Sequence, residues 1–402
     1  MRNVPAWLTP ARTDALVMRR RIGMVSTYPP KICGLATFAG ALEREIRELG
    51  NIVDVVRIDD GRDMTPREWP VVADLSNGIP RSIANAGALL STYDIVIIQH
   101  EYGIFGGVDG DEVLNLLDVI GTPTIVVLHT VPLAPSPHQR YVLTELVERC
   151  TRVVVMSEAA RQRLGTYGVD LLKVAMIPHG AVTRPVVLDP HDDADRSHGA
   201  ADTRRIQMLT WGLLGPGKGI EHVVNAMALL PDATTRPHYT VAGVTHPNVL
   251  ARSGDVYRNG LIEMTFANRV APSVTFDARY RTVDELTRFV MSKSLVVLPY
   301  DSPDQVTSGV LVDAIALGRP VIATAFPHAV ELLSSGAGIL VPPRDPVSLA
   351  EAIRSVDTNR DQLAAMAAEA SRIAPQLQWS TVAQQYVHIA DDIARRSHSV
   401  AV

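Results

Sequence analysis

The chain has 402 residues, of which 47% are hydrophobic and 20% are charged, and its formal net charge at pH 7 is −5. This composition is typical of a globular protein of roughly two or three domains, and the acidic balance argues against a nucleic-acid partner. The two cysteines, Cys33 and Cys150, form no C-x-x-C pair, which argues against a zinc site or a structural disulfide and suits the reducing cytoplasm.

The first residues lack the features of a targeting segment. Pro5, Pro10, Arg12 and Asp14 interrupt the stretch where a signal peptide would be apolar, and no run approaches the roughly 18 apolar residues of a membrane span. We therefore expect residues 1–19 to form a tail and the protein to be cytoplasmic, without a transmembrane segment. Peripheral contact with a membrane stays open.

From residue 20 onward, short β-branched runs alternate with amphipathic helical stretches, which indicates parallel α/β layers. The pattern predicts two sets of strands. The first set covers 21–26, 52–57, 94–99, 124–129, 153–156 and 174–178, and the second covers 206–212, 238–243, 273–277, 295–299, 321–324 and 338–342. Residues 184–205 separate the sets, and their lack of apolar periodicity predicts an interdomain linker.

Two helical segments follow the second set of strands. A helix is predicted over 348–373, opened by a capping box from Ser348 to Glu351. A final helix follows Trp379, and it carries an apolar stripe that needs a surface to cover, formed by Val382, Tyr386, Ile389 and Ile393.

Three histidines follow predicted strands of the first set: His100, His129 and His179. Ligands of open α/β sheets bind at the carboxyl ends of the strands, so we expect at least one of these histidines to face a cleft. The alternative for each is a hydrogen-bonded loop residue. In loop 27–42, Gly34 stands where the backbone approaches another group closely, and loop 100–110 contains four glycines, which favours a loop that shapes a substrate site.

In the second half, residues 293–324 are typical of a strand, polar loop, helix, turn and second strand. The loop from Gln305 to Ser308 lies at the amino end of the predicted helix, where unpaired N–H groups favour phosphate. Asp313 then falls inside an otherwise apolar helix and needs a partner. Ribose hydroxyls and the side chain of Arg319 are both open as that partner.

Gly212, Gly217 and Lys218 match all but the last position of the phosphate-binding pattern G-x-x-x-x-G-K-[ST]. The last position is Gly219, so the hydroxyl that binds magnesium is missing, which argues against an ATPase or kinase. Lys218 still suits a diphosphate as a point charge.

Taken together, these residues resemble the family 4 retaining glycosyltransferases of the GT-B fold, from about Arg21 to Arg395. That family carries two glutamates separated by seven residues, then Ala-x-Ala-x-Gly-x-Pro-Val. Those positions are occupied here by Gln305, Asp313, Ala314, Ala316, Gly318, Pro320 and Val321. The resemblance implies two doubly wound parallel-sheet domains facing a cleft: an acceptor-side domain at 20–183, joined by a return helix at 380–398, and a nucleotide-sugar domain at 206–375.

The resemblance also implies residue roles. It places Gln305 near the transferred sugar and Asp313 on the ribose. The family's Arg and Lys at the donor diphosphate fall on Leu213 and Lys218, so Lys218 takes that role. The expected donor-binding residues further include Gly34, Gly212 and the backbone of Ser308, Gly309 and Val310, with His129 beside the sugar and with His100, Glu101, Tyr102, Ser157 and His179 as cleft candidates.

The implied activity is retaining transfer of a hexose, with glucose and mannose the first guesses, from a nucleotide diphosphate sugar to an acceptor hydroxyl of a carbohydrate or glycolipid. The residues require no metal or other cofactor. The altered acidic pair keeps open a non-catalytic nucleotide-sugar binder or a partner subunit of another transferase. A nucleotide-dependent phosphotransferase would instead use residues 212–219.

Overall fold

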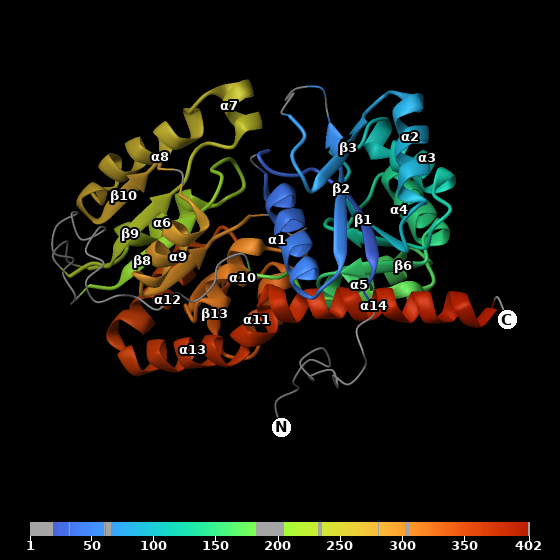
Figure 1. The fold of residues 1–402 in the computed structure, drawn as a ribbon. Helices are drawn as coiled ribbons and strands as arrows, with labels where there is room; N and C mark the ends of the chain where they lie inside the picture. The colour runs from blue at the N-terminus through green and yellow to red at the C-terminus, as the bar shows by residue number, and fades with distance from the viewer. Residues whose placement is uncertain are drawn as a thin grey trace. The chain divides into compact units, whose positions relative to one another are not determined.

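The computed structural model describes residues 19–31, 33–59, 61, 66–181, 205–231, 235–279, 281–301 and 305–400, with side chains to residue 396 (Figure 1). Nearly all of the predicted tail and linker lie outside these residues. The chain divides into two compact units, the first within residues 1–182 and 378–402 and the second within residues 183–377.

Unit 1 contains a seven-stranded parallel sheet in the order β3-β2-β1-β4-β5-β6-β7. Its strands are β1 (Arg21–Ser26), β2 (Ile52–Asp59), β3 (Val71–Ser76), β4 (Ile95–His100), β5 (Thr124–Leu128), β6 (Arg152–Val155) and β7 (Val174–Met176). Every residue of β4 and β5 is buried, which explains their continuous apolar runs. Strand β3 was not predicted, because it is an edge strand in which only Val71 and Leu75 are buried.

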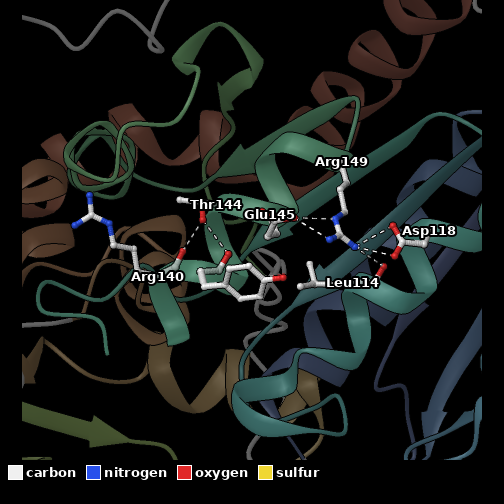
Figure 2. A network of polar contacts seen from close by, with 7 residues as sticks. Leu114, Asp118, Arg140, Thr144, Glu145 and Arg149 are labelled. Carbon is white, nitrogen blue, oxygen red and sulfur yellow. Dashed lines mark hydrogen bonds and ion pairs between the residues drawn. The ribbon is translucent and has the colours of Figure 1, made fainter. Parts of the chain in front are cut away.

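The helices of unit 1 are α1 (Gly34–Glu48), α2 (Pro80–Leu90), α3 (Glu112–Val119), α4 (Pro137–Arg149), α5 (Glu158–Thr166) and α14 (Trp379–Val400), with 3-10 turns at Val108–Gly110 and Leu171–Lys173. Figure 2 shows how α3 and α4 are joined at the surface. Arg149 donates to both carboxylate oxygens of Asp118, at 2.9 and 2.8 Å, and to Glu145, at 2.8 and 3.1 Å.

The C-terminal helix α14 completes the core of unit 1, where it packs against α1 (Figure 1). Its stripe is buried at Val382, Tyr386 and Ile393. A Cβ atom at Gly180 would lie 2.3 Å from the Trp379 ring, so glycine is required there for the indole to pack.

Unit 2 contains a six-stranded parallel sheet in the order β10-β9-β8-β11-β12-β13. Its strands are β8 (Gln207–Trp211), β9 (His238–Ala242), β10 (Val274–Asp277), β11 (Leu295–Leu298), β12 (Val321–Thr324) and β13 (Gly338–Val341). Its helices are α6 (Ile220–Ala228), α7 (Pro247–Ser253), α8 (Val256–Ala267), α9 (Val283–Met291), α10 (Gly309–Ala316), α11 (Pro327–Leu333), α12 (Pro346–Thr358) and α13 (Arg360–Ile373), with 3-10 turns at Ala271–Ser273 and Ala374–Leu377.

The predicted capping box at Ser348 is wrong. Helix α12 begins at Pro346, and Asp345 is its N-cap, accepting hydrogen bonds from the N–H groups of Val347 and Ser348 at 3.0 Å. An aspartate N-cap followed by proline at the first helical position is a strong start signal. The predicted helix over 348–373 is also two helices, α12 and α13, with Asn359 between them. Across the described residues, we find no helix long and apolar enough to cross a membrane.

Candidate functional site

In unit 1, a row of polar side chains extends the sheet face that packs on α1. Side chains alternate along a strand, so Gln99 continues the face of Ile97, and His129 continues the face of Val127. The Nε2 atom of His129 lies 2.8 Å from Oε1 of Gln99. The ring of Phe38, on α1, meets His129 edge-on at 4.7 Å and His179 at 5.0 Å between centroids.

The two histidines of this row are held neutral. Burial, with the neighbouring His179 and His100 adding to it, places the pKa of His129 well below its ordinary value. Burial also lowers the pKa of His179 to about 4, and its Nδ1 lies 2.7 Å from the carbonyl oxygen of Gly180. Both rings therefore act at neutral pH as hydrogen-bonding groups without charge.

His100 lies on the other face of the sheet and is fully buried. Its ring stacks on Phe105 and meets Tyr102 edge-on, and neither ring nitrogen has a hydrogen-bond partner among the described residues. Burial lowers its pKa to about 3. The structure thus places His100 in the interior of unit 1 and not at its surface.

The remaining candidates of unit 1 are held by local contacts. Glu101 accepts hydrogen bonds from the N–H of Tyr102 at 3.0 Å and from the hydroxyl of Thr130, and burial raises its pKa. The Tyr102 hydroxyl donates to the carbonyl of Gln139 at 3.2 Å. Ser157 is buried as the N-cap of α5. At Gly34, a Cβ atom would meet nothing within 4 Å, so no described part of the chain demands a glycine there.

In unit 2, the amino end of α10 offers an anion site. Ser308 caps this helix through its hydroxyl, and its own N–H donates to Nδ1 of His328 at 2.9 Å. The N–H groups of Gly309 and Val310 occupy the first two helical positions, which have no intrahelical partner. They are therefore available to phosphate, whereas the N–H of Ser308 is engaged. Nearby, Nε2 of Gln305 donates to the carbonyl of Thr307 at 3.0 Å.

The loop that carries Lys218 is fixed against the end of β11. The ammonium group of Lys218 lies 4.6 Å from the ring centroid of Tyr300, and the N–H of Asp301 donates to the carbonyl of Gly217 at 3.0 Å. Gly219 has φ +66°, and a Cβ atom there would lie 1.8 Å from the carbonyl oxygen of Pro299. Because β8 and β11 are neighbouring parallel strands, the Lys218 loop and the start of α10, which follow them, lie at the same edge of the sheet.

Tyr300 and His328, which contact Lys218 and Ser308, were not predicted from the sequence. The sequence did contain a sign of both residues, because each is a polar residue that closely follows a predicted strand, where ligands of parallel sheets bind. Gly212 adopts φ +121° directly after β8, and Asp313 is buried within α10. The guanidinium of Arg319 donates to the carbonyls of Leu317, Met291 and Lys293.

One group in the described part of the chain has the ligand types for a metal ion: Glu221, His222 and Asp301, whose ligand atoms lie within 4.8 Å of one another. These side chains already bond within the protein. Glu221 accepts from the Tyr257 hydroxyl at 2.7 Å, and His222 lies 3.1 Å from Asp301, which also pairs with Arg344 at 3.5 Å.

Comparison with known families covers both units. Residues 205–359 match the family described as glycosyl transferases group 1, and residues 32–184 match the family described as glycosyltransferase family 4. The chain belongs to the group 1 glycosyltransferases. The family expected from the sequence is thereby confirmed.

Among curated relatives, this group 1 glycosyltransferase is similar to a D-inositol 3-phosphate glycosyltransferase of Kineococcus radiotolerans, at 28% identity over 277 residues covering 64% of the chain and 60% of the relative. It is also similar to the protein of the same name from a Nocardioides species, at 26% identity over 281 residues covering 66% of the chain and 58% of the relative. The chain therefore spans about three fifths of the length of these relatives.

Solved structures agree with the group 1 assignment at the level of the fold. The Anabaena protein HepE in complex with UDP superposes with a TM-score of 0.74 at 18% identity, over 92% of this chain and 100% of that one. Sucrose-phosphate synthase from Thermosynechococcus elongatus superposes with a TM-score of 0.72 at 18% identity, over 93% and 99%. The predicted GT-B fold is confirmed.

Proposed function

We propose that this group 1 glycosyltransferase moves a hexose from a nucleotide diphosphate sugar to an acceptor hydroxyl, with retention at the anomeric carbon. The observation that carries the proposal is the anion site of unit 2. The N–H groups of Gly309 and Val310 and the ammonium group of Lys218 lie at the same sheet edge, where a diphosphate is stabilised.

In the proposed reaction, the bond between the anomeric carbon and the diphosphate oxygen breaks, and the acceptor oxygen bonds to that carbon on the same face. The proton of the acceptor passes to the departing phosphate oxygen, so no protein nucleophile takes part. Lys218 and the start of α10 stabilise the negative charge that develops on the leaving group. His129 lies beside the transferred sugar, Asp313 binds the ribose, and positive charge from the chain takes the place of a metal ion.

The related structures suggest where to begin with donors and acceptors. HepE has been solved in complex with UDP-glucose, so UDP-glucose is the first donor to test, followed by mannose donors. The curated relatives are named for D-inositol 3-phosphate, which joins carbohydrates and glycolipids as a candidate acceptor.

The test is thermal stabilisation of the purified protein by UDP-, GDP- and ADP-sugars, by their free diphosphates, and by ATP with and without magnesium. The expected result is a shift with one nucleotide series, independent of magnesium, followed by transfer with that donor. A shift confined to ATP with magnesium would overturn the proposal in favour of a phosphotransferase.

Lys218→Ala should weaken binding of the nucleotide sugar and of its free diphosphate by the same factor, about tenfold or more for a lost charged contact. Lys293→Ala is the matched control. The ammonium group of Lys293 lies 4.6 Å over the ring of Phe289, the same type of contact, but it precedes β11 and so lies at the opposite edge of the sheet. Equal losses in the two variants would refute the assignment of Lys218.

A second candidate is a nucleotide-sugar binder without transferase activity, which Gln305 specifically favours. An amide cannot stabilise positive charge at the anomeric carbon as a carboxylate does. Gln305→Glu should raise turnover in an active enzyme. Donor binding with neither transfer nor hydrolysis in the wild type would select the binder.

A further inference from the structure

Gln99 is buried at the carboxyl end of β4, with no exposed surface. Its Oε1 lies 2.8 Å from Nε2 of His129, while its amide nitrogen has no hydrogen-bond partner among the described residues. The hydroxyl of Ser26 is likewise buried and unpartnered in the described chain, on the neighbouring strand β1 and one step beyond the Val25–Ile98 pair. Two unsatisfied polar groups thus accompany one well-formed bond.

A buried amide with an unsatisfied N–H₂ group destabilises the fold relative to a satisfied one. An apolar residue would complete this face of the sheet without that penalty, as Ile95 and Ile97 do earlier in the strand. The Gln99 side chain is therefore explained by its contact with His129 and not by packing.

The contact fixes which ring nitrogen carries the proton. A neutral imidazole has one N–H and one lone pair, and an amide oxygen only accepts hydrogen bonds. The ring nitrogen that faces Oε1 must therefore carry the hydrogen, and Nδ1 carries the lone pair. His129 is neutral, as its lowered pKa indicates.

We infer that Gln99 is a positioning residue that holds His129 as its Nε2–H tautomer, so that Nδ1 accepts a hydrogen bond from a hydroxyl of the substrate. This inference rests on the proposed function, since it assigns the chemistry of the group that His129 meets. A lone pair attracts a hydroxyl and repels phosphate or carboxylate oxygens, so His129 selects a sugar hydroxyl and not an anion.

The tautomer is measured directly on the intact protein. Long-range ¹H–¹⁵N spectra of the ¹⁵N-histidine-labelled chain at pH 7 report the proton position for each of its 12 histidines, and the His129→Gln variant identifies the His129 signals. The expected pattern is neutral Nε2–H. An Nδ1–H or imidazolium pattern at His129 would overturn the inference.

Variants of Gln99 then separate positioning from packing. Gln99→Glu keeps the shape and places a carboxylate on the ring, so His129 should change to the imidazolium pattern. Gln99→Leu should produce a mixture of tautomers. Gln162→Glu, at an exposed position of α5, is the matched control and should leave the His129 signals unchanged. Unchanged His129 signals in both Gln99 variants would refute the assignment.

A binding measurement links the pair to the substrate. With the donor series found by thermal stabilisation, Gln99→Leu should lose about tenfold in affinity for the nucleotide sugar and keep its affinity for the free diphosphate. An equal loss of affinity for both ligands would overturn the inference that His129 contacts a sugar hydroxyl. If Gln99→Leu does not fold, the same measurement is made with Gln99→Glu. If no nucleotide sugar binds the wild type, the proposed function fails, while the spectra still decide the tautomer.

Discussion

The glycine that ends the Lys218 loop allows a quantitative prediction. Gly219 has φ +66°, and the Cβ of an alanine would lie 1.8 Å from the carbonyl oxygen of Pro299, where real Cβ contacts stay above 3.0 Å. The backbone conformation alone destabilises an alanine by about 1–2 kcal/mol. Relief of the contact requires the loop or the end of β11 to move by more than 1 Å, and such overpacking adds about 1–3 kcal/mol.

We therefore expect Gly219→Ala to lower the free energy of unfolding by about 2–5 kcal/mol. Gly217→Ala is the matched control in the same loop, because Gly217 has φ +87° and its Cβ would meet nothing within 4 Å. It should lose only about 1 kcal/mol, since an alanine also reduces the entropy of the unfolded chain. Urea unfolding followed by circular dichroism measures both. Losses equal to within about 0.5 kcal/mol would refute the role of the Pro299 carbonyl.

Two further predictions concern unit 1. The pKa of His100 is about 3 in the fold and about 6.5 when unfolded, so between these values the unfolded chain binds more protons and stability falls as pH falls. His100→Phe removes this proton uptake, so the free energy of unfolding should fall by about 2 kcal/mol less in the variant than in the wild type between pH 7 and pH 5. Urea unfolding at both pH values measures the difference. An equal fall in the variant and the wild type would contradict the burial of a neutral ring. Ser157→Ala should lose about 1 kcal/mol as an N-cap deletion, similar to the loss in Ser136→Ala at the start of α4, and no loss at Ser157 would contradict its capping role.

Much of the fold followed from the sequence because the central strands are buried on both faces. The apolar residues of β4 and β5 follow one another without a break, from Ile95 to Ile98 and from Ile125 to Leu128, and such short β-branched runs are typical of strands buried on both faces. The edge strand β3 has no such run, because only Val71 and Leu75 are buried, so it resembles a loop in sequence. The start of α12 was misplaced because Ser348 fits a capping box, although Asp345 and Pro346 provide the stronger signal.

The candidate site was predictable only in part. The positions of histidines after strands were visible in the sequence, but the face to which each side chain points depends on alternation and register. This is why His100 and His129, both at strand ends, have different surroundings. The partners of the candidate residues come from other strands, as Gln99 does for His129 and Tyr300 for Lys218, so sequence spacing does not reveal them.

The return of α14 to unit 1 sets the order in which the two units can mature on the ribosome. Unit 2 is one continuous segment, within 183–377, whereas the core of unit 1 needs Trp379, Val382 and Tyr386, which are made after unit 2. Domains fold as units during synthesis. Unit 2 can thus be complete while Phe38 of α1 still lacks the Trp379 ring that packs against it. Of the two units, the one whose translation begins first is therefore the one that finishes second.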